Sequence, residues 1–349
     1  AAVSSNDFAS AFERIISDNS SYYVLAYYPP SNRRDGKFHR IDVRTSRPGL
    51  RVRARRGYAA PKGNPQTQSA VMNNGGASPV VLRALNSPLP TSGLTMQIFA
   101  APFKGPAADA SVVLGVELRG RDLTLDAGES VELSYVAINA SGQTRGDTDV
   151  FTLKLPPDVK AHVGRNGLRI LRRFDLPPGR YQLRVAAHDI AGARVGSLNY
   201  DLEIPDYARL PLSMSGLLLT ARAGTTIPTA RADALLQRVM PAPPVALRAF
   251  PTDDEVLVFA EIYDRTGGTP HSVDITTTVT DSGGKVVWKH SDERSSSDLK
   301  GANGSYAHVV RVPMAGAEPG RQVLTVEARS RLGPVTSRQV PFDVVARMP

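Results

Sequence analysis

Three arginines at alternate positions, Arg51, Arg53 and Arg55, are the strongest candidates for a chemical role in this chain. Alternate side chains of an extended strand point to one face, so the three guanidinium groups would form a row. Such a row suits phosphate, carboxylate or sulfate groups, because each guanidinium presents a rigid fork of donors. It could equally be a charged outer face that prevents aggregation between strands. The sequence leaves both interpretations open.

The net charge of +9 is concentrated around these arginines. Of the 42 basic and 33 acidic residues, 11 and two respectively lie between Arg33 and Lys62, which leaves 31 of each in the rest of the chain. The rest of the chain is therefore neutral. Any long-range electrostatic role would belong to this one short segment.

The six histidines do not fall into a spacing known from catalysis or zinc binding. No HExxH pattern, GxSxG elbow or GxxxxGK[ST] loop occurs, so metalloprotease, serine-nucleophile and phosphate-loop chemistry all lack a motif. His188-Asp189 is a single pair at the end of an expected strand. We expect all six to occupy surface or turn positions: His39, His162, His188, His271, His290 and His308.

Two acidic clusters could offer oxygen ligands to calcium, Asp253-Asp254-Glu255 and Asp292-Glu293. Neither has the spacing of a calcium-binding loop, and we expect solvated loop charges. The chain has no cysteine, so disulfides and thiolate sites are excluded. The sequence therefore predicts a protein that is not an enzyme, with no catalytic, cofactor-binding or metal-binding residues.

Short strand-like segments separated by Gly and Pro run through residues 78–349. At 41% hydrophobic content, a chain of 349 residues can bury more than one core. Close strand spacing with turns between is typical of antiparallel β-sandwiches. The predicted fold class is mainly β, with two immunoglobulin- or fibronectin-like antiparallel β-sandwiches.

A repeat supports two copies of one module. Residues 178–204 align without a gap to residues 319–345, at an offset of 141, with seven identities in 27 positions. Each copy begins with a Pro-Gly-Arg turn. The identical residues Leu183, Val185 and Ala187 share one face of a strand, so the repeat preserves a core and not a site.

The chain divides into five predicted segments. Residues 1–60 hold a short helix, a strand and a basic hairpin, and residues 61–77 are a linker rich in Pro, Gly, Asn, Gln and Ser. Residues 78–205 form the first β-sandwich, residues 206–243 a connector, and residues 244–349 the second β-sandwich.

Three motifs between residues 22 and 61 point to a family. They are the strand Tyr23-Val24-Leu25-Ala26-Tyr27-Tyr28-Pro29, the turn Asp35-Gly36-Lys37-Phe38 and the RPGLRVRARRGY segment at 47–58. In these motifs the chain resembles the end of the von Willebrand factor A-related domain of a large family of acidobacterial secreted proteins. The resemblance implies that residues 1–60 are the α+β remnant of a doubly wound A-domain.

The resemblance also implies a metal-ion-dependent adhesion site on a DxSxS loop upstream. Asp18-Asn19-Ser20-Ser21-Tyr22 has tyrosine in place of the second serine and lies at the wrong end of such a fold. The divalent-metal site of the family is therefore not carried over to any residue, and no cofactor is expected. The resemblance further implies the C-terminal part of a longer protein and an extracellular or periplasmic location.

Three functions follow from these observations. The first is a structural or binding region that presents or spaces an adhesive A-type domain, with a protein or cell-surface polymer as partner. The second is a carbohydrate-binding accessory region, which would need exposed aromatic residues in a row, whereas the chain has one tryptophan, Trp288. The third, nucleic-acid binding through residues 33–62, predicts steep salt dependence and is least favoured, because the rest of the chain is neutral. No apolar run approaches the roughly 20 residues that span a bilayer.

Overall fold

The computed structural model describes residues 38–41, 57–59, 76–125, 129–266, 269–298 and 305–346. Residues 1–68 and residues 69–349 form two compact units. In the first unit, β1 (Phe38–Arg40) pairs antiparallel with β2 (Gly57–Ala59). The helix and the tyrosine-rich strand predicted for residues 1–60 lie outside the described residues.

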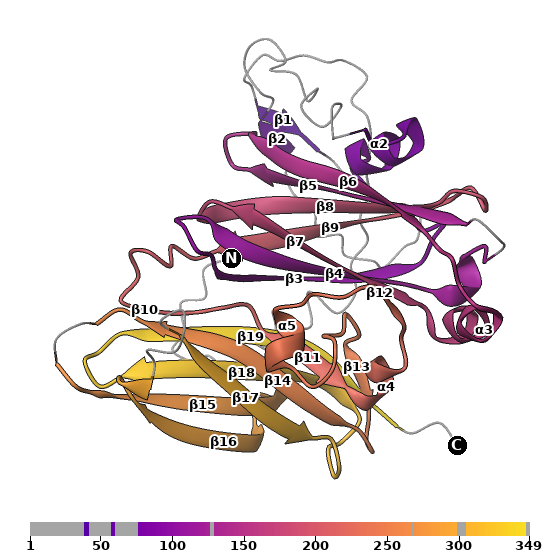
Figure 1. Ribbon diagram of the computed structural model, residues 1–349. Helices are drawn as coiled ribbons and strands as arrows, with labels where there is room; N and C mark the ends of the chain where they lie inside the picture. The colour runs from indigo at the N-terminus through magenta and orange to yellow at the C-terminus, as the bar shows by residue number, and fades with distance from the viewer. Residues whose placement is uncertain are drawn as a thin grey trace, which may run out of the picture. The chain divides into compact units, whose positions relative to one another are not determined.

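The first β-sandwich consists of two antiparallel sheets (Figure 1). One has the strand order β3-β4-β7 and the other the order β6-β5-β8-β9. Alternate residues of these strands, such as Leu114 and Val116 on β4 and Leu183 and Val185 on β8, meet in a core between the sheets. The strands are β3 (Met96–Lys104), β4 (Ala110–Leu118), β5 (Ser130–Asn139), β6 (Thr144–Thr152), β7 (Leu168–Leu176), β8 (Gly179–Asp189) and β9 (Arg194–Ile204).

The second β-sandwich repeats this arrangement. Strand β14 pairs with β17 on one side and with β10 and β11 on the other, and the facing sheet has the order β13-β19-β18-β15-β16. The predicted fold class, mainly β with two β-sandwiches, is confirmed. The strands are β10 (Leu212–Met214), β11 (Leu218–Ala221), β13 (Ala249–Pro251), β14 (Glu255–Asp264), β15 (Ser272–Asp281), β16 (Val286–Ser295), β17 (Tyr306–Pro313), β18 (Gly320–Ser330) and β19 (Val335–Val345).

The segment predicted as a connector, residues 206–243, contributes strands to both sandwiches. Its strands β10 and β11 pair antiparallel with β14 of the second sandwich. After the short helix α4 (Arg222–Thr225), strand β12 (Thr229–Arg231) pairs parallel with β7 at the edge of the first sandwich. The short helix α5 (Leu236–Val239) follows.

A hydrogen bond at the repeated Pro-Gly-Arg turn is preserved with different chemistry in the two copies. In the first copy the Tyr181 hydroxyl donates to the Pro177 carbonyl at 3.0 Å, as in the tyrosine corner of β-sandwich domains. In the second copy the Gln322 side-chain amide donates to the Glu318 carbonyl at 3.2 Å. Gln322 and Glu318 lie 141 positions after Tyr181 and Pro177, which is the offset of the sequence repeat. The predicted repeat therefore includes this corner.

Helix α2 (Pro79–Asn86) covers the outer face of strands β5 and β8, where the sequence predicted only strands. Its buried residues Val81, Ala84 and Leu85 recur at the spacing of one helix face. The Glu132 carboxylate accepts a hydrogen bond from the backbone N–H at the start of the helix at 2.6 Å, and Arg184 donates to the Leu85 carbonyl near its end. Both charges complement the helix dipole. The remaining helices are η2 (Gly120–Asp122) and α3 (Pro157–Asn166).

We expect Tyr181→Phe to lower the free energy of unfolding by about 1 kcal/mol, because it removes the corner hydrogen bond and keeps the buried ring. Urea unfolding followed by circular dichroism measures the change. Ser282→Ala, an exposed hydroxyl in a hairpin turn, is the control. Equal stability of the Tyr181→Phe variant and the native chain would show that the corner bond contributes nothing.

Candidate functional site

The outer faces of two strands, one in each sandwich, are buried where solvent would be expected. All nine residues of β4 are buried, and so are residues 256–260 of β14. A strand with one face on a core and one in water alternates between apolar and polar residues. The uninterrupted burial therefore means that something covers the second face of each strand.

Each sandwich covers the other through an apolar cluster that we call the joint. The Phe103 and Phe259 rings meet there with centroids 6.2 Å apart. Gly115 leaves room for the ring of Phe99 opposite it, since a Cβ at Gly115 would lie 2.0 Å from a ring carbon. The joint consists of Phe99, Ala101, Phe103, Val113 and Leu171 from the first sandwich, Leu218, Leu257 and Phe259 from the second, and Leu236, Met240 and Ala246 from the intervening chain.

The backbone carbonyl of Pro102, at the edge of the joint, accepts two hydrogen bonds from residues that follow the first sandwich in the chain. The Pro102 carbonyl accepts hydrogen bonds from the Gly216 N–H at 2.7 Å and from the Tyr207 hydroxyl at 2.9 Å. Gly216 lies in the gap between β10 and β11, and a Cβ there would be 2.6 Å from the Cα of Ala101. The interruption of this strand thus allows the two backbones to approach.

Two tyrosines extend the joint with satisfied polar groups. The Tyr263 hydroxyl accepts from the Lys104 N–H at 3.0 Å and donates to the Glu261 carboxylate at 2.6 Å. The rings of Tyr207 and Tyr263 meet edge to face with centroids 5.1 Å apart. Burial raises the pKa of both phenols, so both are neutral donors.

A buried ion pair anchors the intervening segment to the first sandwich. Arg169 on β7 is fully buried and donates to the Glu117 carboxylate on β4 at 2.8 Å. The same guanidinium donates to the Gly224 carbonyl of helix α4 at 2.7 Å. Loss of one partner would leave the other charge buried and uncompensated. The pair therefore fixes α4 against the sheet.

The expectation of surface or turn positions is wrong for His188 and His308, which are buried in strands. His271 lies in the loop between β14 and β15 as expected, although its side chain is 2% exposed. His188 and Asp189 do not form a pair, because adjacent residues of β8 point to opposite faces. His188 lies 3.4 Å from Glu132 on the face covered by α2.

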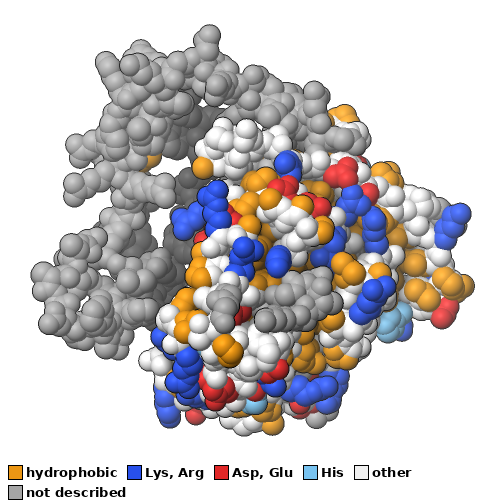
Figure 2. Space-filling view, turned by 60° about the vertical axis from the view of Figure 1, so that its left-hand side comes forward, with side chains coloured by type: hydrophobic (Ala, Val, Ile, Leu, Met, Phe, Trp, Pro, Cys, Tyr) orange, Lys and Arg blue, Asp and Glu red, His pale blue; other side chains and the backbone are white. Residues whose placement is uncertain are grey.

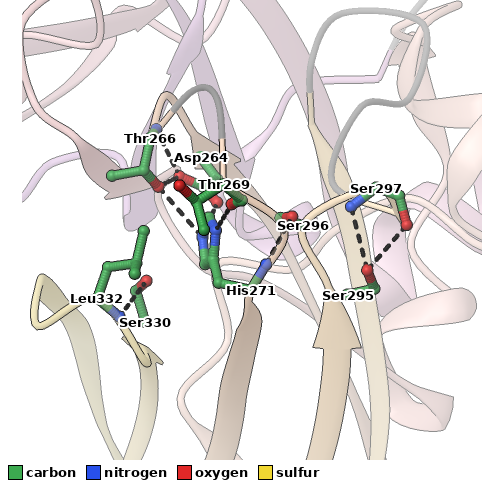
Figure 3. A network of polar contacts seen from close by, with 9 residues as sticks. All are labelled: Asp264, Thr266, Thr269, His271, Ser295, Ser296, Ser297, Ser330 and Leu332. Carbon is green, nitrogen blue, oxygen red and sulfur yellow. Dashed lines mark hydrogen bonds and ion pairs between the residues drawn. The ribbon is translucent and has the colours of Figure 1, made fainter.

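The His271 network at the β14–β15 loop holds the residue types of a catalytic triad without its geometry (Figure 3). His271 Nδ1 lies 2.9 Å from the Thr269 carbonyl, while Nε2 lies 2.7 Å from Asp264 Oδ2 and 3.2 Å from the Thr266 hydroxyl. In a triad the acid and the nucleophile contact different ring nitrogens. Here they share one, so His271 cannot act as a base oriented by Asp264.

His308 lies inside the second sandwich, with its Nε2 3.0 Å from the Thr277 hydroxyl. Burial lowers the pKa of His308 to about 4, with smaller effects from nearby charges. One of these charges, Arg294, stacks over the Tyr306 ring at 4.9 Å and donates to the Asp292 carboxylate at 2.9 Å. Arg294 and Asp292 on β16 thus interact with each other and with Tyr306 on β17.

In the described part of the chain, the two acidic clusters do not form a group of three or more possible metal ligands. Asp254 is 7% exposed and accepts from the Arg222 N–H at 3.0 Å, so it is a buried turn acceptor where a solvated charge was expected. Glu255 pairs with Arg311 at 2.7 Å. Among the residues that the structure describes, no three or more His, Cys, Asp or Glu side chains gather. The absence of cofactors remains a prediction.

The arginine row of Arg51, Arg53 and Arg55 lies outside the described residues, and its role remains a prediction. On the described part of the face in Figure 2, basic and acidic side chains are interspersed. The joint was not predicted. Its signal is the unbroken apolar runs 112–114 and 256–260, which leave no polar face on a strand of an antiparallel sheet.

No family model and no curated protein matches this chain. Dimeric latent PorU of Porphyromonas gingivalis is similar over 83% of this chain and 22% of its own, at 12% identity and a TM-score of 0.28. A Bacteroides uniformis β-glucuronidase 2 is similar over 66% and 26%, at 10% identity and a TM-score of 0.25. The fibronectin(III)-like modules of Clostridium thermocellum CbhA match over 71% and 94%, at 14% identity and a TM-score of 0.19. These likenesses carry no functional argument. Within the described ranges, no helix is long and apolar enough to cross a membrane.

We expect His308 to make the folded protein sensitive to acid. Its folded-state pKa of about 4 lies below the ordinary 6.5, so the unfolded chain binds the proton first as the pH falls. The stabilisation is complete above pH 6.5 and is lost as the pH falls to 4, a total of about 3 kcal/mol. Urea unfolding at about pH 7 and about pH 4.5 should show that His308→Gln loses about 2 kcal/mol less than the native chain. The control variant His162→Gln, on helix α3 of the first sandwich, should keep the native loss. An unchanged loss in His308→Gln would contradict the assignment.

Proposed function

We propose that residues 69–349 are a rigid, non-catalytic spacing and binding region of an exported bacterial protein. In this role they present an adhesive A-type domain to a protein or cell-surface polymer outside the cell or in the periplasm. The observation that carries the proposal is the joint, because it turns two sandwiches into one body. Domains within a chain move relative to one another unless their interface is large and hydrophobic.

The arrangement of the joint suits a spacer. It combines apolar side chains from three segments with a carbonyl that accepts two hydrogen bonds, at Pro102. Bending at this place would expose apolar surface and break both hydrogen bonds. A spacer of this kind holds its neighbour at a fixed distance and orientation.

The proposal includes an A-type domain because residues 22–61 resemble the end of such a domain. The same resemblance supports the exported location. A non-catalytic role is supported by the contacts of three histidines. Both ring nitrogens of His271 contact protein oxygens, and one ring nitrogen each of His188 and His308 contacts Glu132 and Thr277. The carbohydrate-binding alternative has less support, because Trp288 is partly buried and packs against the core of the second sandwich.

We expect one narrow distance distribution between spin labels placed on the two sandwiches. The chain has no cysteine, so Ser141→Cys with Ser282→Cys labels two exposed hairpin turns, one in each sandwich. Pulsed electron paramagnetic resonance measures the distance. Phe103→Ala with Phe259→Ala should broaden the distribution, because it opens a cavity in the joint.

The control is Val150→Ala, which truncates an exposed side chain on β6 and should leave the distribution narrow. A broad distribution in the labelled chain without joint substitutions would show that the two sandwiches move independently, and the proposed spacer role would then fail.

A further inference from the structure

Two acidic side chains meet at one end of the first sandwich. Glu129 directly precedes β5, and Asp189 is the last residue of β8. Val131 is paired with Asp189 in the sheet. Since residues two apart on a strand share a face, Glu129 and Asp189 point to the same side, into the end of the core.

Both carboxyl groups are buried, and each has one oxygen without a partner. Glu129 is 3% exposed and Asp189 is 0% exposed. The Ala191 N–H donates to Glu129 Oε1 at 3.3 Å, and the Thr124 N–H and hydroxyl donate to Asp189 Oδ2 at 3.1 and 3.0 Å. Glu129 Oε2 and Asp189 Oδ1 have no hydrogen-bond partner in the described part of the chain. Few buried side-chain polar atoms in native proteins lack a hydrogen-bond partner, and here two such oxygens belong to neighbouring acids.

The two carboxyl groups lie within hydrogen-bonding reach of each other, and burial together with Asp189 raises the pKa of Glu129. Two acceptors in contact repel unless a positive charge or a proton lies between them. The adjacent His188 does not supply that charge, because it points to the opposite face toward Glu132. Among the described residues, no basic side chain forms an ion pair with Glu129 or Asp189.

The second sandwich has a different residue type at the equivalent end. The Ile190 N–H donates to the Ser130 carbonyl in the first sandwich, and the Arg331 N–H donates to the Ser272 carbonyl in the second. This correspondence makes His271 the counterpart of Glu129. His271 Nε2 lies 2.7 Å from Asp264 Oδ2 (Figure 3). The first sandwich thus places two acids together where the second places a histidine beside an acid.

We propose that Glu129 and Asp189 bind a hard divalent cation, calcium or magnesium, which takes the place that the His271 side chain fills in the second sandwich. Carboxylate oxygens are the preferred ligands of both ions. No third acidic or histidine side chain joins the pair among the described residues, so other oxygen ligands complete the shell. Sites with few charged ligands bind weakly, with dissociation constants on the order of 0.1–1 mM, as in extracellular modules.

Thr124 and Gly192 hold the pair in position. A Cβ at Gly192 would lie 2.1 Å from Asp189 Oδ2 and 2.4 Å from the Thr124 hydroxyl. Only glycine leaves room for the hydrogen bonds that orient the Asp189 carboxylate. The site therefore depends on the loop after β8 as well as on the two strands.

The test is the melting temperature of the full chain in calcium chloride, in magnesium chloride and in a chelator. At about ten times the dissociation constant, the cation should raise the melting temperature by about 2–4 °C. Glu129→Gln and Asp189→Asn keep the shape and remove one charge, so both should lose most of this rise. Glu255→Gln, an exposed acid paired with Arg311, should keep it.

Glu129→His places an imidazole where the second sandwich has one. We expect this variant to melt in the chelator above the native chain in the chelator and to show no rise with either cation. A native chain whose melting temperature neither cation changes would overturn the proposal. A rise with cation that survives in both Glu129→Gln and Asp189→Asn would overturn it too, since the ion would then bind elsewhere. Stability that ignores both cations and increases on mild acidification would show a shared proton in place of the cation.

Discussion

The burial of both faces of strands β4 and β14 is the constraint on which residues 69–349 depend. A sheet face that is removed from water needs an apolar partner, and each sandwich is that partner for the other. This contact requires glycine at two positions. Gly115 gives its side-chain space to the Phe99 ring, and Gly216 interrupts the first strand of the second sandwich so that the backbones can meet. Local irregularities in both sandwiches thus have a common cause in the joint.

The two copies of the module show which features the fold requires and which it leaves free. The corner before β8 and β18 keeps a side-chain hydrogen bond to the carbonyl four residues earlier, although Tyr181 becomes Gln322. The bond is therefore required, and the ring is not. At the other end of the core, Glu129 and His271 occupy equivalent positions. An acid can stand there only where its surroundings compensate it, because an uncompensated buried charge costs several kcal/mol.

The strands and the repeat could be predicted from the sequence because their signals are local. Leu183, Val185 and Ala187 alternate along one strand, and turn residues mark its ends. The joint and the buried charges could not be predicted, since they depend on pairs far apart in the chain. Glu129 precedes a strand and has the sequence environment of an exposed loop acid, yet it is buried beside residues about 60 positions later in the chain, Asp189 and Ala191. The burial of both faces of β14 could have been predicted from residues 256–260, because five consecutive apolar residues in an antiparallel strand leave no polar face for solvent.

The near balance of charge in the sandwiches fits the proposed spacer role through the range of electrostatic forces. Residues 63–349 hold 30 basic and 28 acidic residues. Some of these charges are paired at short distance, as in Arg311 with Glu255 at 2.7 Å and Arg329 with Glu327 at 2.9 Å. Exposed pairs of this kind add little stability, but they cancel the field beyond about 8–10 Å, the screening length at physiological salt. The basic segment from Arg33 to Lys62 has no such balance. An acidic partner approaching from a distance would therefore be attracted mainly to that segment, because its net charge is +9 and that of residues 63–349 is +2.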